Sequence, residues 1–302
     1  MIKNYFKIAL RTVKRNSIYS IISVLGLAIG ITGASLLYLY IDNELSYDAF
    51  HEESDRIYRI VEISESAERG TRYFGQTAPI LGSTLEEQYP EIDEMVRVYK
   101  PRGHIDMLWK GERIHERNYL ITDSDFFAVF DFEFLSGNSV DPLSRPNTAV
   151  ITERKARELF GEENPIGKVL PVNGMEPVEI TGVIENIPDN SHLQFDILLS
   201  RRNSVFNWED YLNNWEAYGA FTYVMLTESA DLNTFKDKID SYINEQQANN
   251  DNARNFYLQP ITDIYLNSGD IEFGIAEEHG NIFYIYIFSA IGIFLLLIAG
   301  IN

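Results

Sequence analysis

The stretch "IYSIISVLGLAIGITGASLLYLYI", residues 18–41, decides the fold, because none of its 24 residues carries a charge. A helix of this length is about 36 Å long at ~1.5 Å per residue, enough to cross a hydrocarbon core of ~30 Å. A second uncharged run, "IFYIYIFSAIGIFLLLIAGI", covers residues 282–301. We therefore predict two transmembrane helices, residues 18–41 and 282–302, with residues 42–281 folded as a domain between them.

The orientation follows from the basic residues that precede the first span. Residues 1–17 contain five Lys and Arg side chains and no acidic one, and such clusters stay on the cytoplasmic side of a membrane. This predicts a protein of the cell inner (cytoplasmic) membrane, with a cytoplasmic N-terminus and residues 42–281 in the periplasm. A cleaved signal peptide is disfavoured, because the apolar run is longer than the ~7–15 apolar residues of a signal sequence.

Residues 1–17 have a helical pattern of their own. Apolar residues recur at helical spacing along one face and basic residues step by four along another, which predicts an amphipathic helix that contacts membrane lipid at the interface. A charge cluster without regular structure is the alternative. The residues that carry the pattern are Ile2, Phe6 and Leu10 on the apolar face and Lys3, Lys7 and Arg11 on the basic face.

The first span holds a row of small residues. Gly26, Gly30 and Ala34 recur every four residues, and Gly33 stands next to Ala34. Small residues at this spacing let the backbone of a second helix approach closely. We therefore predict that this row is a helix-packing surface.

The composition of residues 42–281 limits what they can bind. They hold all 45 acidic residues of the chain against 20 basic ones. A nucleic-acid partner is therefore not expected, because phosphate binding depends on basic patches. The chain has no cysteine, which excludes disulfides, thiolate zinc sites and a cysteine nucleophile.

The pattern of residues 42–281 predicts a mixed α+β domain. Residues 147–200 read in the order strand, helix, loop, strand, turn, strand, loop, strand. Residues 110–113, "KGER", predict a hairpin turn, and a β-rich part is expected as an insertion at roughly 101–204. Elsewhere we expect strands near 57–63, 95–99, 105–109, 221–226 and 256–259, and helices at 79–88, 153–160 and 232–246.

The segment "LFGEENPIGKVL", residues 159–170, looks like a phosphate-binding loop but departs from its template. A P-loop has four residues between its glycines, a hydroxyl residue after the lysine, and a strand before and a helix after the loop. Here five residues separate Gly161 from Gly167, a valine follows Lys168, and the predicted helix precedes the loop. We therefore expect no nucleotide site and interpret Gly161 as the end of the preceding helix.

We expect no catalytic, cofactor or metal site in this sequence. The five histidines are scattered, and His51 with Asp55 is the only pair at ligand spacing, which is too few ligands for zinc. Ser191 and His192 are neighbours in a loop without a nucleophile elbow, so a turn is the preferred interpretation and a hydrolase is not. The chain is thus predicted not to be an enzyme.

Four segments together resemble the MacB-like/FtsX-like family of ABC transporter permeases, in particular the long permeases of Bacteroidetes. These segments are "YDAFHEESDRIYRI" (47–60), "NTAVITERKARELFGEENPIGKVL" (147–170), "EITGVIENIPDNSHLQFDILLS" (179–200) and "LLLIAGIN" (295–302). The resemblance implies a structural role for the motif residues Tyr47, Asp48, Phe50, Arg56, Tyr58, Arg59, Phe160, Gly161, Pro165, Gly167, Gly182, Ser191, His192, Phe195 and Asp196.

The resemblance implies an architecture and a set of partners. The domain is expected to be a periplasmic core, with a porter-like α/β part and an inserted β-rich part, between two transmembrane α-helices. A separate cytoplasmic ABC ATPase, a permease homodimer, and a periplasmic adaptor or cargo are the implied partners. Family members have further membrane helices, so we expect this chain to be the N-terminal portion of a longer permease.

The implied function is to couple ATP hydrolysis in the partner ATPase to movements of the external domain, for export, efflux or another transport task of the envelope. A two-span membrane sensor with an external ligand-binding domain has the same topology and stays open as the alternative. A membrane-anchored external enzyme is a third hypothesis, and the absence of a catalytic constellation argues against it.

Overall fold

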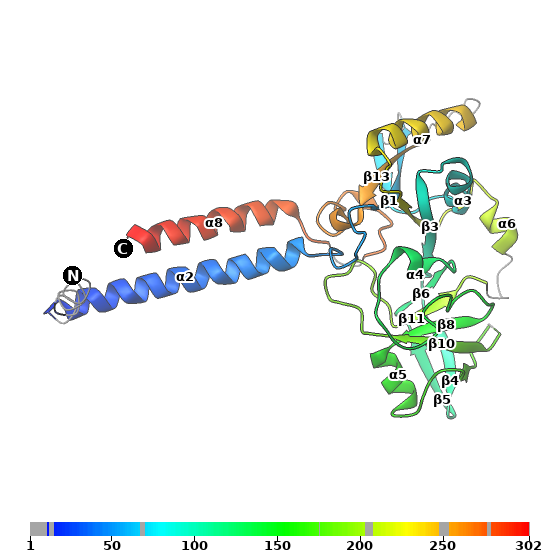
Figure 1. The fold of residues 1–302 in the computed structure, drawn as a ribbon, viewed down its shortest axis with the longest axis horizontal. Helices are drawn as coiled ribbons and strands as arrows, with labels where there is room; N and C mark the ends of the chain where they lie inside the picture. Colours follow the sequence, from blue (N-terminus) through cyan, green and yellow to red (C-terminus); the bar gives the residue numbers. More distant parts are fainter. Residues whose placement is uncertain are drawn as a thin grey trace. The chain divides into compact units, whose positions relative to one another are not determined.

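The computed structural model describes residues 11, 15–66, 70–174, 176–202, 208–247, 254–276 and 279–301. The chain divides into two compact units, a helical unit of Met1–Ser46 with Gly280–Asn302 and a domain of Tyr47–His279 (Figure 1). Of the residues named for the amphipathic helix, Arg11 is helical and exposed. The others lie outside the described residues: Ile2, Lys3, Phe6, Lys7 and Leu10.

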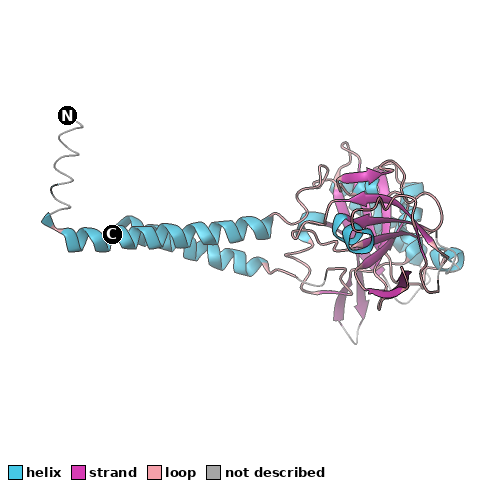
Figure 2. Cartoon of the chain, turned by 90° about the horizontal axis from the view of Figure 1, so that it is seen from below, coloured by secondary structure: helices cyan, strands magenta, loops and turns pink. Residues whose placement is uncertain are grey.

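Two apolar helices form the helical unit, α2 (Ser17–Leu45) and α8 (Ile282–Ile301). Both are long and apolar enough to cross a membrane, and many of their large apolar side chains are exposed. They run side by side (Figures 1 and 2). α2 continues past the predicted end at residue 41 to Leu45, and it includes the polar residues 42–44.

Small residues lie in the contact between α2 and α8. Gly30 is buried, and a Cβ placed on it would stand 2.6 Å from the Cβ of Ala299. A Cβ on Gly33 would stand 3.3 Å from Leu295, while Ala34 is buried and Gly26 half-buried. A larger side chain at Gly30 would therefore push the two helices apart.

One sheet of twelve strands forms the body of the domain. It is mostly antiparallel, with the parallel pairs β10–β8, β11–β6 and β14–β2. β13 (Arg254–Pro260) pairs with β1 and β9 (Val169–Leu170) with β10. The remaining strands follow in sheet order: β14 (Ile271–Glu272), β2 (Gly70–Phe74), β1 (Ile57–Ser66), β12 (Phe221–Leu226), β3 (Ile92–Tyr99), β6 (Tyr119–Thr122), β11 (Ile197–Ser200), β8 (Thr148–Thr152), β10 (Val178–Ile184) and β7 (Phe134–Gly137).

The strands of the predicted insertion, β6 to β11, are neighbours at one end of this sheet. They join the rest through β3 and β6, whose ladder consists of the pairs Val98–Thr122 and Tyr99–Ile121. A separate hairpin, β4 (Ile105–Trp109) and β5 (Glu112–Glu116), turns at "KGER" as predicted. The mixed α+β class is confirmed, and the division at roughly 101–204 stays a prediction.

Apolar side chains of the helices pack against those of the sheet in buried clusters. The helices are α3 (Pro79–Gln88), α4 (Phe126–Val129), α5 (Glu153–Phe160), α6 (Trp208–Leu212), α7 (Leu232–Gln247) and the 3-10 turn Ile261–Asp263. α3 and α5 have the predicted bounds. β2, β6 and α6 were not predicted, because their short segments carry too few residues to show a periodicity.

The local structure predicted for "LFGEENPIGKVL" is confirmed. α5 begins at the N-cap Thr152, whose side chain accepts from the backbone N–H of Lys155, and ends at Gly161, whose φ is 63°. The N–H of Gly161 donates to the carbonyl of Arg157 at 2.9 Å. Lys168 forms an ion pair with Glu163. The glycine at the helix end is required because φ > 0 is strained for other residues.

Candidate functional site

The segment that follows α2 in the sequence is fastened to the loop before β11. Asp48 is fully buried and has a φ of 57°, which a short polar side chain tolerates better than most. Its N–H donates to the carbonyl of Asn190 at 2.8 Å. Its Oδ1 accepts from the N–H of His192 at 3.0 Å and from Ser191 Oγ at 3.3 Å. Two motif segments far apart in the sequence therefore meet at this carboxylate.

The contacts continue into the sheet. Nδ1 of His192 lies 2.8 Å from Asp48 Oδ1, but outside hydrogen-bond angles. Nε2 of His192 shares a hydrogen bond of 2.9 Å with the hydroxyl of Tyr223. Tyr223 stands opposite Arg59 in the β1–β12 register. We call Asp48, His192, Tyr223 and Arg59 the Asp48 cluster; all four side chains are buried.

The Asp48 cluster is incompletely hydrogen-bonded. Nη2 of Arg59 donates to Gln259 Oε1 at 2.5 Å and to Ser268 Oγ at 3.0 Å. Among the described residues, Nε and Nη1 of Arg59 and Oδ2 of Asp48 have no hydrogen-bond partner. Burial lowers the pKa of Arg59, against the opposing effects of Tyr223, Tyr257 and Asp48. Buried polar atoms without partners cost free energy, so the net contribution of this cluster to stability is reduced.

His51 lies in the same segment as Asp48 and is surrounded by aromatic side chains. Its Nδ1 accepts from the N–H of Asp131 at 3.0 Å, and its ring packs against Phe50, Phe130 and Phe132. Burial lowers the pKa of His51 to about 4, with Asp48 opposing the shift, so the imidazole is neutral at pH 7. An open pocket of about 420 Å³ lies beside it, lined in part by Phe50, Asp131 and Phe132.

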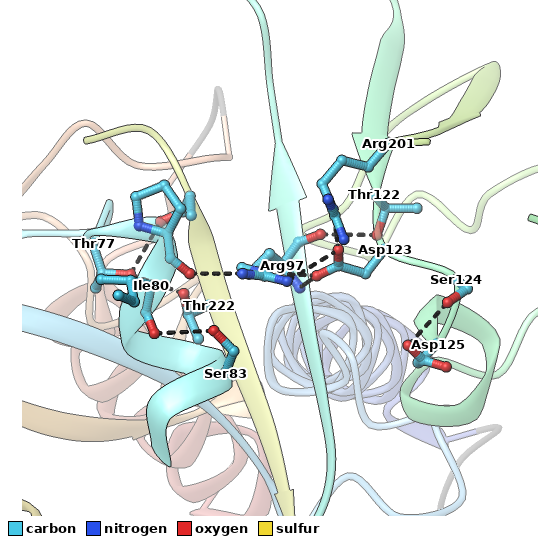
Figure 3. A network of polar contacts seen from close by, with 12 residues as sticks. Thr77, Ile80, Ser83, Arg97, Thr122, Asp123, Ser124, Asp125, Arg201 and Thr222 are labelled. Atoms are coloured by element: carbon cyan, nitrogen blue, oxygen red, sulfur yellow. Dashed lines mark hydrogen bonds and ion pairs between the residues drawn. The ribbon is translucent and has the colours of Figure 1, made fainter. Parts of the chain in front are cut away.

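A second buried cluster lies where β3 and β6 join the two parts of the sheet. Figure 3 shows Arg97 and Arg201 converging on Asp123. Arg97 Nε donates to Asp123 Oδ2 at 2.7 Å, and its Nη1 donates to the carbonyl of Pro79 at 2.8 Å. Thr122 Oγ1 donates to the carbonyl of Arg97 at 3.0 Å. We call Arg97, Asp123 and Arg201 the Asp123 clasp.

The carboxylate of the Asp123 clasp is fully paired. Oδ2 accepts from the backbone N–H and Nε of Arg97, and Oδ1 accepts from Arg97 Nη2 and Arg201 Nε. Burial alone would raise the pKa of Asp123, but the charges and hydrogen bonds of Arg97 and Arg201 outweigh it and lower the pKa below its ordinary value. The carboxylate is therefore ionised throughout the physiological range.

The other motif residues take separate structural positions. Arg56 donates to the carbonyl of Leu226 and pairs with Asp93, each at no more than 2.9 Å. Tyr58 donates to the carbonyl of Asp55. Tyr47 stacks on Tyr265, and Phe160 packs on Trp109.

The remaining motif residues are spread over the domain. Gly182 allows the close approach of Phe134, Phe195 lies in the core, and Pro165 lies in the turn before Gly167. Asp196 binds Asn118, Thr152 and Arg154.

Sequence reasoning missed Tyr223, Arg97, Asp123 and Arg201 as partners in buried clusters. It also treated the histidines as scattered, whereas His104, Asp106 and His115 place one ligand atom each within 4.8 Å of one another. The hairpin turn predicted at residues 110–113 carried the missing signal, because it sets which residues of the two strands face each other.

The comparison with protein families decides the family. The model of the MacB-like periplasmic core domain matches residues 20–242 of the chain. This chain belongs to the MacB-like periplasmic core domain family. The expected resemblance to MacB-like permeases is thereby confirmed.

Solved structures are similar to parts of this chain. A domain assigned to a permease protein from Porphyromonas gingivalis is 22% identical and covers 70% of this chain and 91% of its own, with a TM-score of 0.57, which shows a shared fold. The periplasmic region of MacB from Actinobacillus actinomycetemcomitans is 13% identical over 68% of this chain and 90% of its own, with a TM-score of 0.47.

A curated sequence relative is the uncharacterized ABC transporter permease YknZ of Bacillus subtilis. It is 37% identical over 88 residues, which are 28% of this chain and 19% of that protein. The match thus spans about a fifth of the relative's length. The function of this chain therefore does not follow from the match alone.

Proposed function

We propose that the chain is the N-terminal part of a permease subunit of an ABC transporter. In this proposal it couples ATP hydrolysis by a separate cytoplasmic ATPase to movement of its extracytoplasmic domain, for export, efflux or another envelope-related transport task. The observation that carries the proposal is the MacB-like match over residues 20–242, in a chain with the apolar helices α2 and α8 at the two ends of the domain.

The Asp48 cluster supports a route for this coupling. The chain leaves α2 at Leu45 and within three residues reaches Asp48, which is hydrogen-bonded to residues 190–192. Arg56 then binds the carbonyl of Leu226 in β12. A displacement of α2 would therefore transmit force to the central strands, because the segment between α2 and β1 is hydrogen-bonded to the domain and buried at several positions.

Co-expression of the full-length protein with a cytoplasmic ABC ATPase from the same organism tests the proposal. We expect a stable complex whose ATP hydrolysis exceeds that of the ATPase alone, and we expect Asp48→Asn to reduce this stimulation. Asp189→Asn is the matched control, because Asp189 is an exposed carboxylate in the same loop. Absence of both a complex and stimulated hydrolysis would exclude the ABC permease function.

The proposed topology has a cytoplasmic N-terminus and a periplasmic domain. Because the chain contains no cysteine, a single introduced cysteine reports its side of the membrane without background. Glu228→Cys, at a side chain that is 89% exposed, is expected to react with a membrane-impermeant maleimide added to intact spheroplasts. Arg15→Cys is expected to react only after lysis, and the reverse pattern would overturn the orientation.

The proposal includes a cytoplasmic ATPase, a permease homodimer, and an adaptor or cargo as partners. The two-span sensor is less well supported, because the matching family model and the YknZ relative belong to transporter permeases. A hydrophobic span in the residues after 302 of the full-length protein would favour the permease, and a kinase or coiled-coil module there would favour the sensor.

A further inference from the structure

Three metal-ligating side chains meet on the β4–β5 hairpin. Asp106 in β4 stands directly opposite His115 in β5, and His104 lies just before β4. His115 Nδ1 is 2.5 Å and His104 Nε2 is 3.4 Å from the same oxygen, Asp106 Oδ1. The rings of His104 and His115 cross at 83° with 5.2 Å between their centroids. Both imidazoles therefore converge on one carboxylate.

The spacing of these atoms fits a small divalent ion. Ligands at ~2.0–2.2 Å from a tetrahedral zinc ion lie about 3.3 Å apart. The separation of His104 Nε2 from Asp106 Oδ1, 3.4 Å, is close to this value, and the ligand atoms of all three residues lie within 4.8 Å of one another. The shorter His115–Asp106 contact must open by less than an ångström, roughly the difference from that tetrahedral spacing. His115 is 59% exposed and free to make this adjustment.

The backbone of two of the ligands, Asp106 and His115, lies in a paired hairpin. β4 pairs with β5 over its whole length. On its other edge, the carbonyl of Asp106 accepts from the N–H of Asn173 at 2.8 Å, and the N–H of Leu108 donates to the carbonyl of Pro171 at 3.0 Å. Asp106 and His115 therefore need only side-chain rotation to bind one ion, and this lowers the ordering cost of binding.

Without a metal, two imidazoles sharing one carboxylate would form only a surface cluster that strengthens on protonation. These two interpretations predict opposite pH dependence, which makes them separable.

We propose that His104, Asp106 and His115 bind one divalent transition-metal ion of the zinc type. Two imidazole nitrogens and one carboxylate oxygen suit Zn²⁺ and leave the fourth tetrahedral position to water or to a donor from a binding partner. The bound ion links the residue before β4 to β5 and stabilises the hairpin. This site does not depend on the transport function proposed above.

Zinc titration of the metal-free full chain in detergent at pH 7.5, followed by calorimetry, tests the site. We expect one Zn²⁺ per chain, and at least tenfold weaker binding in each of His104→Ala, Asp106→Asn and His115→Ala. Glu112→Gln is the matched control, because it removes an exposed carboxylate from the same hairpin without removing a ligand. Its zinc affinity is expected to equal that of the wild-type chain.

Two further readouts separate metal binding from a protonated surface cluster. Binding is expected to weaken by at least tenfold at pH 5.5, because imidazole ligands must be deprotonated. Substitution with Co²⁺ is expected to give the visible absorption of a tetrahedral N/O site, which Asp106→Asn abolishes. Equal zinc affinity in Asp106→Asn and wild type, or no saturable binding at pH 7.5, would overturn the proposal.

Discussion

The Asp48 cluster and the Asp123 clasp differ in how completely their polar atoms are hydrogen-bonded. In the Asp123 clasp, both carboxylate oxygens are bound by Arg97 and Arg201. In the Asp48 cluster, Oδ2 of Asp48 and two nitrogens of Arg59 have no hydrogen-bond partner among the described residues. The clasp joins two parts of one sheet, whereas the Asp48 cluster holds the segment next in sequence to α2. We infer that the clasp contributes more to stability than the Asp48 cluster, because its carboxylate is the more completely paired.

The largest effect is expected from the clasp. Asp123→Asn leaves the buried guanidinium of Arg97 and the half-buried guanidinium of Arg201 without a counter-charge, and breaking comparable buried pairs costs about 3–5 kcal/mol. All three tryptophans lie within the domain, so the fluorescence of the full chain in detergent during urea unfolding reports this loss. A loss below about 1 kcal/mol, the range of exposed pairs, would show that the clasp is not the stronger joint.

The stability contributed by His51, in the same segment as Asp48, and the stability contributed by the Asp123 clasp are expected to be lost in different pH ranges. The pKa of His51 is lowered from 6.5 to about 4 by burial, so the unfolded chain binds more protons between these values. Stability contributed by a neutral His51 is complete above pH 6.5 and is lost as pH falls towards 4, on the order of 3 kcal/mol in total.

The clasp responds in a lower pH window. The pKa of Asp123 is lowered from 3.8, so its contribution is present above that value and is lost only at more acidic pH. Urea unfolding of wild type and His51→Gln from pH 7 to pH 4 checks the difference. The variant is expected to lack most of the slope, and an unchanged slope would contradict the assignment to His51.

A smaller loss is expected at the Asp48 cluster. Asp48→Asn keeps the side-chain size and the tolerance for positive φ, but weakens the bonds to Ser191 and His192, which costs about 1–3 kcal/mol. The loss in urea unfolding is expected to be smaller than that of Asp123→Asn, because the cluster already contains unpaired atoms. A larger loss for Asp48→Asn would reverse the comparison.

The smallest effect is expected from an exposed pair. Arg145 binds Glu179 through two nitrogens at 3.0 and 3.1 Å, with Arg145 62% exposed. Glu179→Gln is expected to cost less than about 1 kcal/mol and to cost nothing at 1 M salt, because solvent and ions screen such pairs. The cost of Asp123→Asn is expected to persist at that salt concentration, and a salt-sensitive clasp would mean that water reaches it.

Local elements were predicted best where the sequence pattern is strong within a few residues. α3 begins at Pro79 and ends at Gln88 as predicted, because proline suits the first helical turn and apolar residues recur at helical spacing. Gly161 ended α5 as predicted, since its backbone conformation favours glycine. Short elements such as β6 and α6 escaped prediction for lack of such signals.

The clusters could not be predicted because their members are far apart in the chain. Asp48 and His192 are separated by 144 residues, and Arg201 lies 78 residues from Asp123. His104 and His115 were judged by helical ligand spacing, whereas the hairpin brings them together across two strands. A histidine pair in a hairpin should therefore be compared across the register set by the turn.

The sequence by itself determined the two apolar helices, the mixed α+β class and the local turns, because hydrophobic runs, periodicity and glycine act over a few residues. The tertiary structure alone decided the strand order, the pairing at Asp48 and Asp123, and the group formed by His104, Asp106 and His115. The physical reason is that a buried charge is stable only beside its partner, and which partner it meets depends on the strand order of the whole sheet.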